Sequence, residues 1–161
     1  MATLPPTRRL AYAPEMSISP ESRRLAGILL VVLPTVMYGG VTVLGFLIHD
    51  PAYTENELRQ DLWRAGHAHA GVLLILSLVA LRYVDEAALS ARAKWFARAA
   101  IPASAILLPA AFFFSMLRPG ATEPNGFIYL AYVGAVVLAL GVLVLGVGLL
   151  RRPREGRRPL E

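Results

Sequence analysis

The chain of 161 residues contains no cysteine, which excludes disulfide bridges, iron–sulfur clusters, thiolate zinc sites and catalysis by a thiol. Lysine is nearly absent as well, since Lys94 is the only one and all other basic residues are arginines. Together with abundant alanine, glycine, valine and leucine, this usage is typical of a GC-rich bacterial genome. The sequence also lacks the phosphate-loop, dinucleotide, zinc-protease and serine-hydrolase motifs. No catalytic residues are therefore predicted.

Charge is missing from long stretches of the chain, since only 17% of the residues are charged and 56% are hydrophobic. The mean hydropathy of +0.54 is well above that of an ordinary soluble domain. At about 1.5 Å per residue, a stretch of about 20 residues crosses a hydrocarbon core of about 30 Å. Four such stretches are found, at residues 25–48, 63–84, 97–117 and 127–150. We therefore predict an all-α, polytopic membrane protein with four transmembrane helices in a bundle.

The segments outside these stretches are polar. Residues 1–22 contain four prolines and no hydrophobic period, which predicts a disordered cytoplasmic tail. Residues 23–150 form the membrane domain, and residues 151–161, with five arginines, are predicted to be a basic cytoplasmic tail. The first apolar stretch is too long for a signal peptide, so we expect it to be retained. Thr54 followed by Glu57 predicts a capping box at the start of the second helix.

Basic residues are distributed unevenly between the connections. Four precede the first span, four lie between residues 82 and 98, and five follow the last span, whereas the other two connections hold two and one. The positive-inside rule therefore places both termini on the cytoplasmic side of a bacterial plasma membrane, with residues 50–61 and 118–126 on the outer side. Asp85 and Glu86 are predicted to be a solvated helix end.

The net charge of +5 is explained by these terminal arginines, which meet anionic lipid headgroups, so nucleic acid is not an expected partner. The lipid bilayer is the expected partner, with a homo-oligomer or a larger membrane complex as further alternatives.

Glycines recur where helices are expected to approach one another. Gly39 and Gly40 in the first span leave room for another helix. Gly134, Gly141 and Gly148 recur every seven residues, which places a smooth stripe along one face of the fourth span. This stripe predicts helix pairing, either within the bundle or between copies.

All three histidines are predicted to lie near the outer membrane face. His49 ends the first span, and His67 and His69 lie in the outer part of the second. Ionisable residues inside a membrane are rare and mark ligand, proton or ion sites. Met116, at the outer end of the third span, lies at the same level and offers a thioether that copper accepts. These four residues are a candidate site for haem or a transition metal such as copper.

Helix geometry limits this candidate site. Residues two apart on a regular helix point about 200° apart, so His67 and His69 cannot both face one ion without local distortion. One of them would then be a ligand, and the other would bond a carboxylate such as Asp61 or face the headgroups. Two alternatives stay open: hydrated interfacial histidines without a special role, or a path for protons or ions.

Three segments, the second and third of which overlap, carry a resemblance to known proteins. They are MSISPESRRLAGILLVVLPTV (16–36), PAYTENELRQDLWRAGHAHAG (51–71) and RAGHAHAGVLLILSLV (64–79). Together they resemble a group of small, uncharacterised four-span membrane proteins of actinobacteria, over roughly residues 16–150. This resemblance implies an integral membrane protein and carries no activity with it.

More distantly, the HAHAG run is similar to the histidine-bearing second helix of haem–copper oxidase subunit I relatives, in which a histidine ligates haem iron. That likeness implies a haem-ligating role for His67 or His69 alone. The chain lacks the further spans and later histidines of those oxidases, so oxygen reduction is not implied. Two functions are predicted: haem or transition-metal binding near the outer face, or alternatively a non-catalytic structural or interaction subunit of a larger membrane complex.

Overall fold

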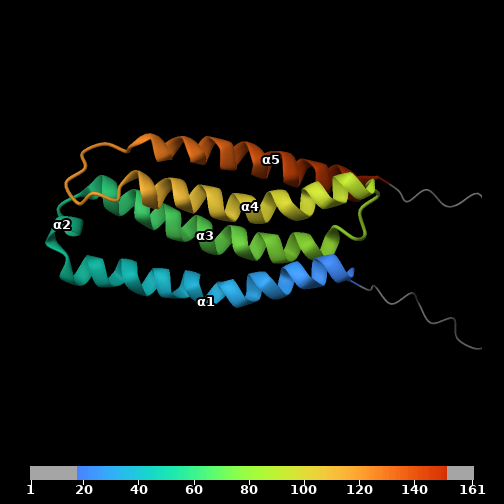
Figure 1. Cartoon of the computed structure of the whole chain (residues 1–161), viewed down its shortest axis with the longest axis horizontal. Coiled ribbons are helices and arrows are strands. Elements are labelled where there is room, and N and C mark those ends of the chain that lie inside the picture. Colours follow the sequence, from blue (N-terminus) through green and yellow to red (C-terminus); the bar gives the residue numbers. More distant parts are fainter. Residues whose placement is uncertain (1–17, 152–161) are drawn as a thin grey trace, which may run out of the picture.

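The computed structural model describes residues 18–151, and that part of the chain contains helices and no strands. Four long helices dominate it: α1 (Pro20–His49), α3 (Glu57–Tyr83), α4 (Ala91–Ser115) and α5 (Tyr129–Leu150). All four, α5 together with the turn before it, are long and apolar enough to cross a membrane. The predicted all-α bundle of four membrane-spanning helices is therefore confirmed. The helices lie side by side along one axis (Figure 1).

Two short helices complete the described chain. α2 (Pro51–Thr54) joins α1 to α3, and a 3-10 turn, η1 (Gly126–Ile128), leads into α5. We call the end of the bundle that holds α2 the α2 end. The opposite end, where α1 begins and α5 finishes, we call the terminal end (Figure 1).

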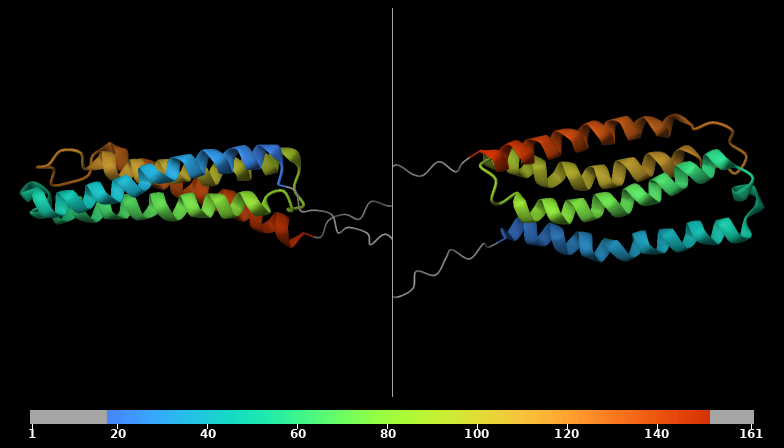
Figure 2. Two further views of the ribbon diagram at one scale, coloured as in Figure 1. Left: turned by 90° about the horizontal axis from the view of Figure 1, so that it is seen from below. Right: turned by 180° about the vertical axis from the view of Figure 1, so that it is seen from behind.

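The four helices form an open row. α1 packs on α3, α3 on α4 and α4 on α5, whereas α3 and α5 barely touch. Among the long helices of residues 18–151, α1 packs substantially on α3 alone, and it lies at one edge of the row in Figure 1 and in the right view of Figure 2. None of the residues in the most apolar stretch of α1 is buried, against 39% in α4. α1 is therefore the helix with the largest uncovered surface.

The main apolar core lies toward the terminal end, where α3, its loop to α4, α4 and α5 meet. It is built from small and branched side chains: Ala80, Val84, Ala87, Ala97, Ile101 and Leu145. The glycine stripe of α5 lies beside this core. A Cβ atom on Gly141 would lie 2.8 Å from the Cβ of Ala100, and one on Gly148 would lie 2.5 Å from Leu89. The missing side chains therefore let α5 approach α4 and the preceding loop within the same chain.

The first helix begins earlier than predicted. The expected tail over residues 1–22 is wrong in its last three residues, because α1 starts at Pro20. Ser19 caps the helix, its hydroxyl accepting a hydrogen bond from the Ser22 backbone N–H at 3.2 Å, and proline is favoured in the first helical turn. Residues 1–17 of that predicted tail and residues 152–161 of the basic segment lie outside the described residues.

The cap of α3 also differs from the prediction. Asn56 caps the helix in place of Thr54, and its Oδ1 accepts from the Arg59 backbone N–H at 3.0 Å. The Asn56 side-chain amide also donates to the backbone oxygens of Pro119 and Ala121, at 3.2 and 2.9 Å. One side chain therefore caps α3 and holds the connection between α4 and α5 against it.

Candidate functional site

His67 turns its ring toward α1. A Cβ atom placed on Gly40 would lie 2.8 Å from His67 Nε2, and one placed on Gly39 would lie 3.8 Å from its Nδ1. The room left by this glycine pair is therefore occupied by an imidazole ring. The ring fills the space between α1 and α3, in contact with the α1 backbone.

His69 faces a different neighbour. Its Nδ1 lies 2.7 Å from the backbone oxygen of Ala65 in the same helix, and its ring centroid lies 5.2 Å from that of Phe112 in α4. The side chain is otherwise exposed. The two histidines thus have separate partners, as the angular spacing of a regular helix requires.

His49 and Met116 have environments that differ from those of the two histidine rings. His49 is the last residue of α1 and is exposed, whereas Met116 is the C-cap of α4 and is fully buried. Within residues 18–151, no three histidine, aspartate or glutamate side chains lie close enough together to hold a metal ion. The structure therefore gives no support to a haem or metal site made by the predicted ligands.

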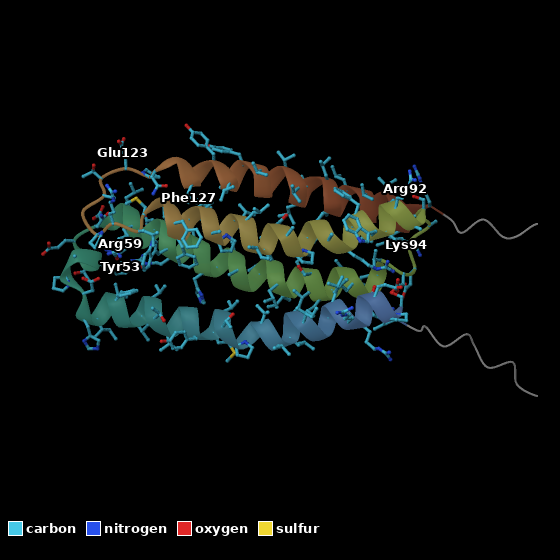
Figure 3. All side chains as sticks on the ribbon, in the orientation of Figure 1. Tyr53, Arg59, Arg92, Lys94, Glu123 and Phe127 are labelled. Carbon is cyan, nitrogen blue, oxygen red and sulfur yellow. The ribbon has the colours of Figure 1, made fainter. Side chains whose placement is uncertain are left out.

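A buried arginine at the α2 end has a more distinctive environment than the histidines. Arg59, in the first turn of α3, has a side chain only 5% exposed. Its guanidinium carbon lies 4.4 Å from the ring centroid of Trp63 and 5.8 Å from that of Tyr53 in α2. Phe46 of α1 completes the group, 5.4 Å from Trp63 between centroids. We call Arg59, Trp63, Tyr53 and Phe46 the arginine cage; Figure 3 labels Arg59 and Tyr53 side by side.

The polar atoms of the arginine cage are incompletely bonded. The hydroxyl of Tyr53, the Nε and Nη1 of Arg59 and the Nε1 of Trp63 are all buried, with no hydrogen-bond partner among the described residues. Burial raises the pKa of Tyr53 above its ordinary value of 10.0, whereas the positive charge and the side-chain N–H donors of nearby Arg64, and then the charge of Arg59, act in the opposite direction. Arg59 and Trp63 are four residues apart, so they are neighbours on one face of α3. This spacing is the one feature of the sequence from which their contact could have been predicted.

The terminal end holds a second polar group, in which the bonding is complete. We call Ser19, Ser22, Asp85 and Arg98 the polar clasp. Arg98 donates to a carboxylate oxygen of Asp85 and, through Nε, to the buried Ser22 hydroxyl at 3.0 Å. The Ser19 backbone N–H donates to the other Asp85 oxygen at 3.0 Å. The clasp ties the start of α1 to the α3–α4 loop and to α4.

Asp85 is therefore not a solvated helix end as predicted, because only 17% of its side chain is exposed. Burial alone would raise the pKa of this carboxyl, but hydrogen bonds from Ser19, Arg98 and Ser22 outweigh burial and lower the pKa below 3.8. Its neighbour Glu86 pairs with Arg82 and is half-exposed, as expected of a helix end.

The uncovered side of α1 is largely apolar, but its half nearer the α2 end also carries polar and small side chains. A shallow groove of about 510 Å³ follows the half of α1 nearer the α2 end, and it is lined by Tyr38, Val41, Thr42, Gly45 and His49 together with Phe46 and Asp50. We call the first five of these residues the α1 face. Tyr38 is 73% exposed. Thr42 donates its hydroxyl to the Tyr38 backbone oxygen at 3.0 Å, so its own polar group is satisfied within the helix.

Comparison with known proteins adds no relative. No family model matches the chain, and neither a curated protein nor a solved structure matches it.

Proposed function

We propose that the protein is a non-catalytic interaction subunit of a larger membrane assembly, and that its α1 face docks onto a transmembrane helix of another subunit. The observation that carries this proposal is the position of Tyr38. At about 1.5 Å per residue, Tyr38 lies about 16 Å from the His49 end of α1 and about 27 Å from the Pro20 end. Its phenol therefore lies deep in the hydrocarbon region, on the uncovered side of the helix.

An exposed hydroxyl at that depth is unfavourable against lipid alone. Hydrocarbon offers no hydrogen-bond partner, and an unpaired hydroxyl in such surroundings costs several kcal/mol, about 2–7 depending on the reference state. Tyrosine that faces lipid is enriched at the membrane interfaces, where its hydroxyl reaches water. A facing helix with an acceptor group would satisfy the Tyr38 hydroxyl, which supports a protein neighbour at this position.

The other edge of the row supports the same proposal by contrast. The exposed residues along the middle of α5 are aliphatic: Val133, Val136, Leu140, Leu143 and Val147. Smooth aliphatic surfaces are suited to lipid tails, whereas helix–helix contacts in membranes are enriched in small and polar residues. Gly45, which has no atom of another residue near its missing Cβ, lies on the α1 face. The α1 face therefore differs chemically from the middle of α5, although other exposed residues of α1, such as Val31, Met37 and Leu44, are apolar as well.

We also propose that the terminal end faces the cytoplasm of a bacterial plasma membrane. Figure 3 labels Arg92 and Lys94 at the terminal end and Glu123 at the α2 end, in line with the arginine-rich segments that flank the terminal end. Cytoplasmic loops of membrane proteins carry an excess of lysine and arginine, which supports this orientation. The α1 face would then lie in the half of the membrane nearer the outside.

A photoreactive benzophenone side chain introduced at position 38 tests the docking proposal in membranes of cells that express the full chain. The matched control position is 136 on α5, where the residue is 59% exposed. We expect illumination to give a discrete protein adduct at position 38 and lipid adducts only at position 136. The mass of the adduct separates a second copy of the chain from a different subunit. Lipid adducts alone at both positions would contradict the docking proposal.

A further inference from the structure

We propose that the arginine cage binds an oxyanion group, a phosphate or carboxylate, at the α2 end of the bundle. The site is built from three neighbouring elements, since Phe46 belongs to the end of α1, Tyr53 to α2, and Arg59 and Trp63 to the start of α3. This inference rests on other observations than the docking proposal, although Phe46 and Asp50 also line the groove along the α1 face.

The guanidinium of Arg59 has a negatively charged neighbour, Asp50, but does not form a hydrogen bond with it. Its Nη1 lies 3.8 Å from Asp50 Oδ2, which is close enough for Coulomb attraction and too far for a hydrogen bond. Asp50 is itself 31% exposed, so water screens part of that attraction. The guanidinium lies over the rings of Trp63 and Tyr53, whose faces stabilise its positive charge.

The unbonded atoms of the cage share one chemical character. Arginine and tryptophan nitrogens can only donate hydrogen bonds, and a tyrosine hydroxyl can donate one. Three side chains thus present buried donors with no acceptor among residues 18–151. A buried donor without an acceptor is strongly unfavourable, so the missing partner is a group rich in acceptor oxygens.

Charge selects an oxyanion among the possible acceptors. Arg59 lies in the first turn of α3, where the helix dipole favours a negative group. Arg64, one turn further along, places a second positive charge near the Tyr53 hydroxyl. Hydrogen bonds from a guanidinium to a carboxylate or phosphate are stronger than those to a neutral oxygen. The same chemistry is offered by a lipid headgroup and by a free anion in solution.

Trp63 fluorescence tests the site in the full chain. The chain has two tryptophans, so Trp95→Phe leaves Trp63 as the only reporter. This protein is placed in nanodiscs of neutral phosphatidylcholine, with and without anionic phosphatidylglycerol, and inorganic phosphate is titrated at constant ionic strength. We expect a saturable change in Trp63 emission. A change with phosphatidylglycerol alone assigns the group to a lipid headgroup, and a change with phosphate in neutral discs assigns it to a free anion.

Variants separate binding from simple packing. Tyr53→Phe keeps the ring and removes one donor, and should weaken binding about tenfold. Asp50→Asn removes a competing negative charge and should tighten binding, whereas Arg59→Gln should abolish it. Arg118→Gln, at an exposed arginine of the same end, is the matched control and should leave binding unchanged. If neither phosphate nor phosphatidylglycerol alters Trp63 emission, or if Asp50→Asn has no effect on a signal that is seen, the cage holds water only and the proposal is wrong.

Discussion

The two ends of the bundle each hold an arginine that is largely shielded from solvent, and the two arginines have different surroundings. At the terminal end, Arg98 donates to Asp85 and to two serine hydroxyls. At the α2 end, Arg59 lies over two adjacent aromatic rings, with two of its nitrogens unbonded. A satisfied polar network rigidifies the structure around it, whereas an incomplete one is either a source of instability or a binding site. The polar clasp is therefore the stabilising end, and the arginine cage is the end that can respond to a ligand.

The largest expected effect comes from breaking the clasp. Asp85→Asn removes the carboxylate from a partly buried ion pair and leaves the Arg98 charge without its partner, so we expect the free energy of unfolding to fall by about 3 kcal/mol. Unfolding in detergent micelles, followed by circular dichroism, measures this loss. Glu86→Gln is the matched control, because its half-exposed pair with Arg82 should contribute about 1 kcal/mol or less. Equal losses in the two variants would remove the distinction between a clasp and a surface pair.

Acid should weaken the same end. Because the folded-state pKa of Asp85 is lowered, its contribution to stability is complete above its unfolded-state value of 3.8. That contribution is lost as the pH falls below 3.8 and through the lower folded-state value. The free energy of unfolding should therefore fall more steeply in the natural chain than in Asp85→Asn when the pH is lowered from about 6 to about 3. Parallel pH profiles would show that Asp85 is not the group responsible.

The packing of His67 against the middle of α1, between the two ends of the bundle, can also be tested. Gly40→Ala places a methyl group against the His67 ring, 2.8 Å from Nε2 on the present backbone, and should cost about 1–2 kcal/mol of stability. His67→Ala in the same chain should relieve much of that cost, so a double-mutant cycle should give a coupling energy of about 1 kcal/mol. Gly27→Ala is the control, since no atom lies near its missing Cβ. Additive effects at positions 40 and 67 would contradict the packing of the ring against α1.

Removing one hydroxyl from each end gives the smallest and most selective comparison. Ser22→Ala deletes a hydroxyl that accepts from Arg98, and should lower the free energy of unfolding by about 1 kcal/mol. Tyr53→Phe deletes a buried hydroxyl without a hydrogen-bond partner, and in neutral detergent without phosphate should change stability by less than about 0.5 kcal/mol or increase it. Thermal unfolding of the two variants side by side measures the difference. A larger loss from Tyr53→Phe would mean that the cage hydroxyl is already bonded.

The fold was predictable because the long apolar stretches set the number and the approximate ends of the helices. The boundaries shifted where local capping decided them, at Ser19 and Asn56. The open order of the row was not predictable, because hydropathy does not say which helices pack together. The seven-residue recurrence of glycine in α5 indicated close packing, but only the coordinates show that α4 is the neighbour.

The candidate sites were less predictable than the fold. Three histidines at one membrane level suggested a common site, but level along the membrane does not fix the direction in which a side chain points. His67 and His69 therefore have different neighbours. The polar clasp joins residues 66 apart in sequence, and no local pattern marks such a contact. The arginine cage was overlooked because an arginine in an acidic connection is ordinarily solvated.

Oxygen accessibility of spin labels tests the central claim, that α1 faces a protein neighbour and α5 faces lipid. Because the chain has no cysteine, Val41→Cys and Leu140→Cys each give a single labelling site, on residues 65% and 49% exposed. In membranes that contain the assembly, the label at position 41 should be several times less accessible to dissolved oxygen than the label at position 140. The two should become similar once the chain is purified as a monomer. Equal accessibility in the membranes would contradict the account.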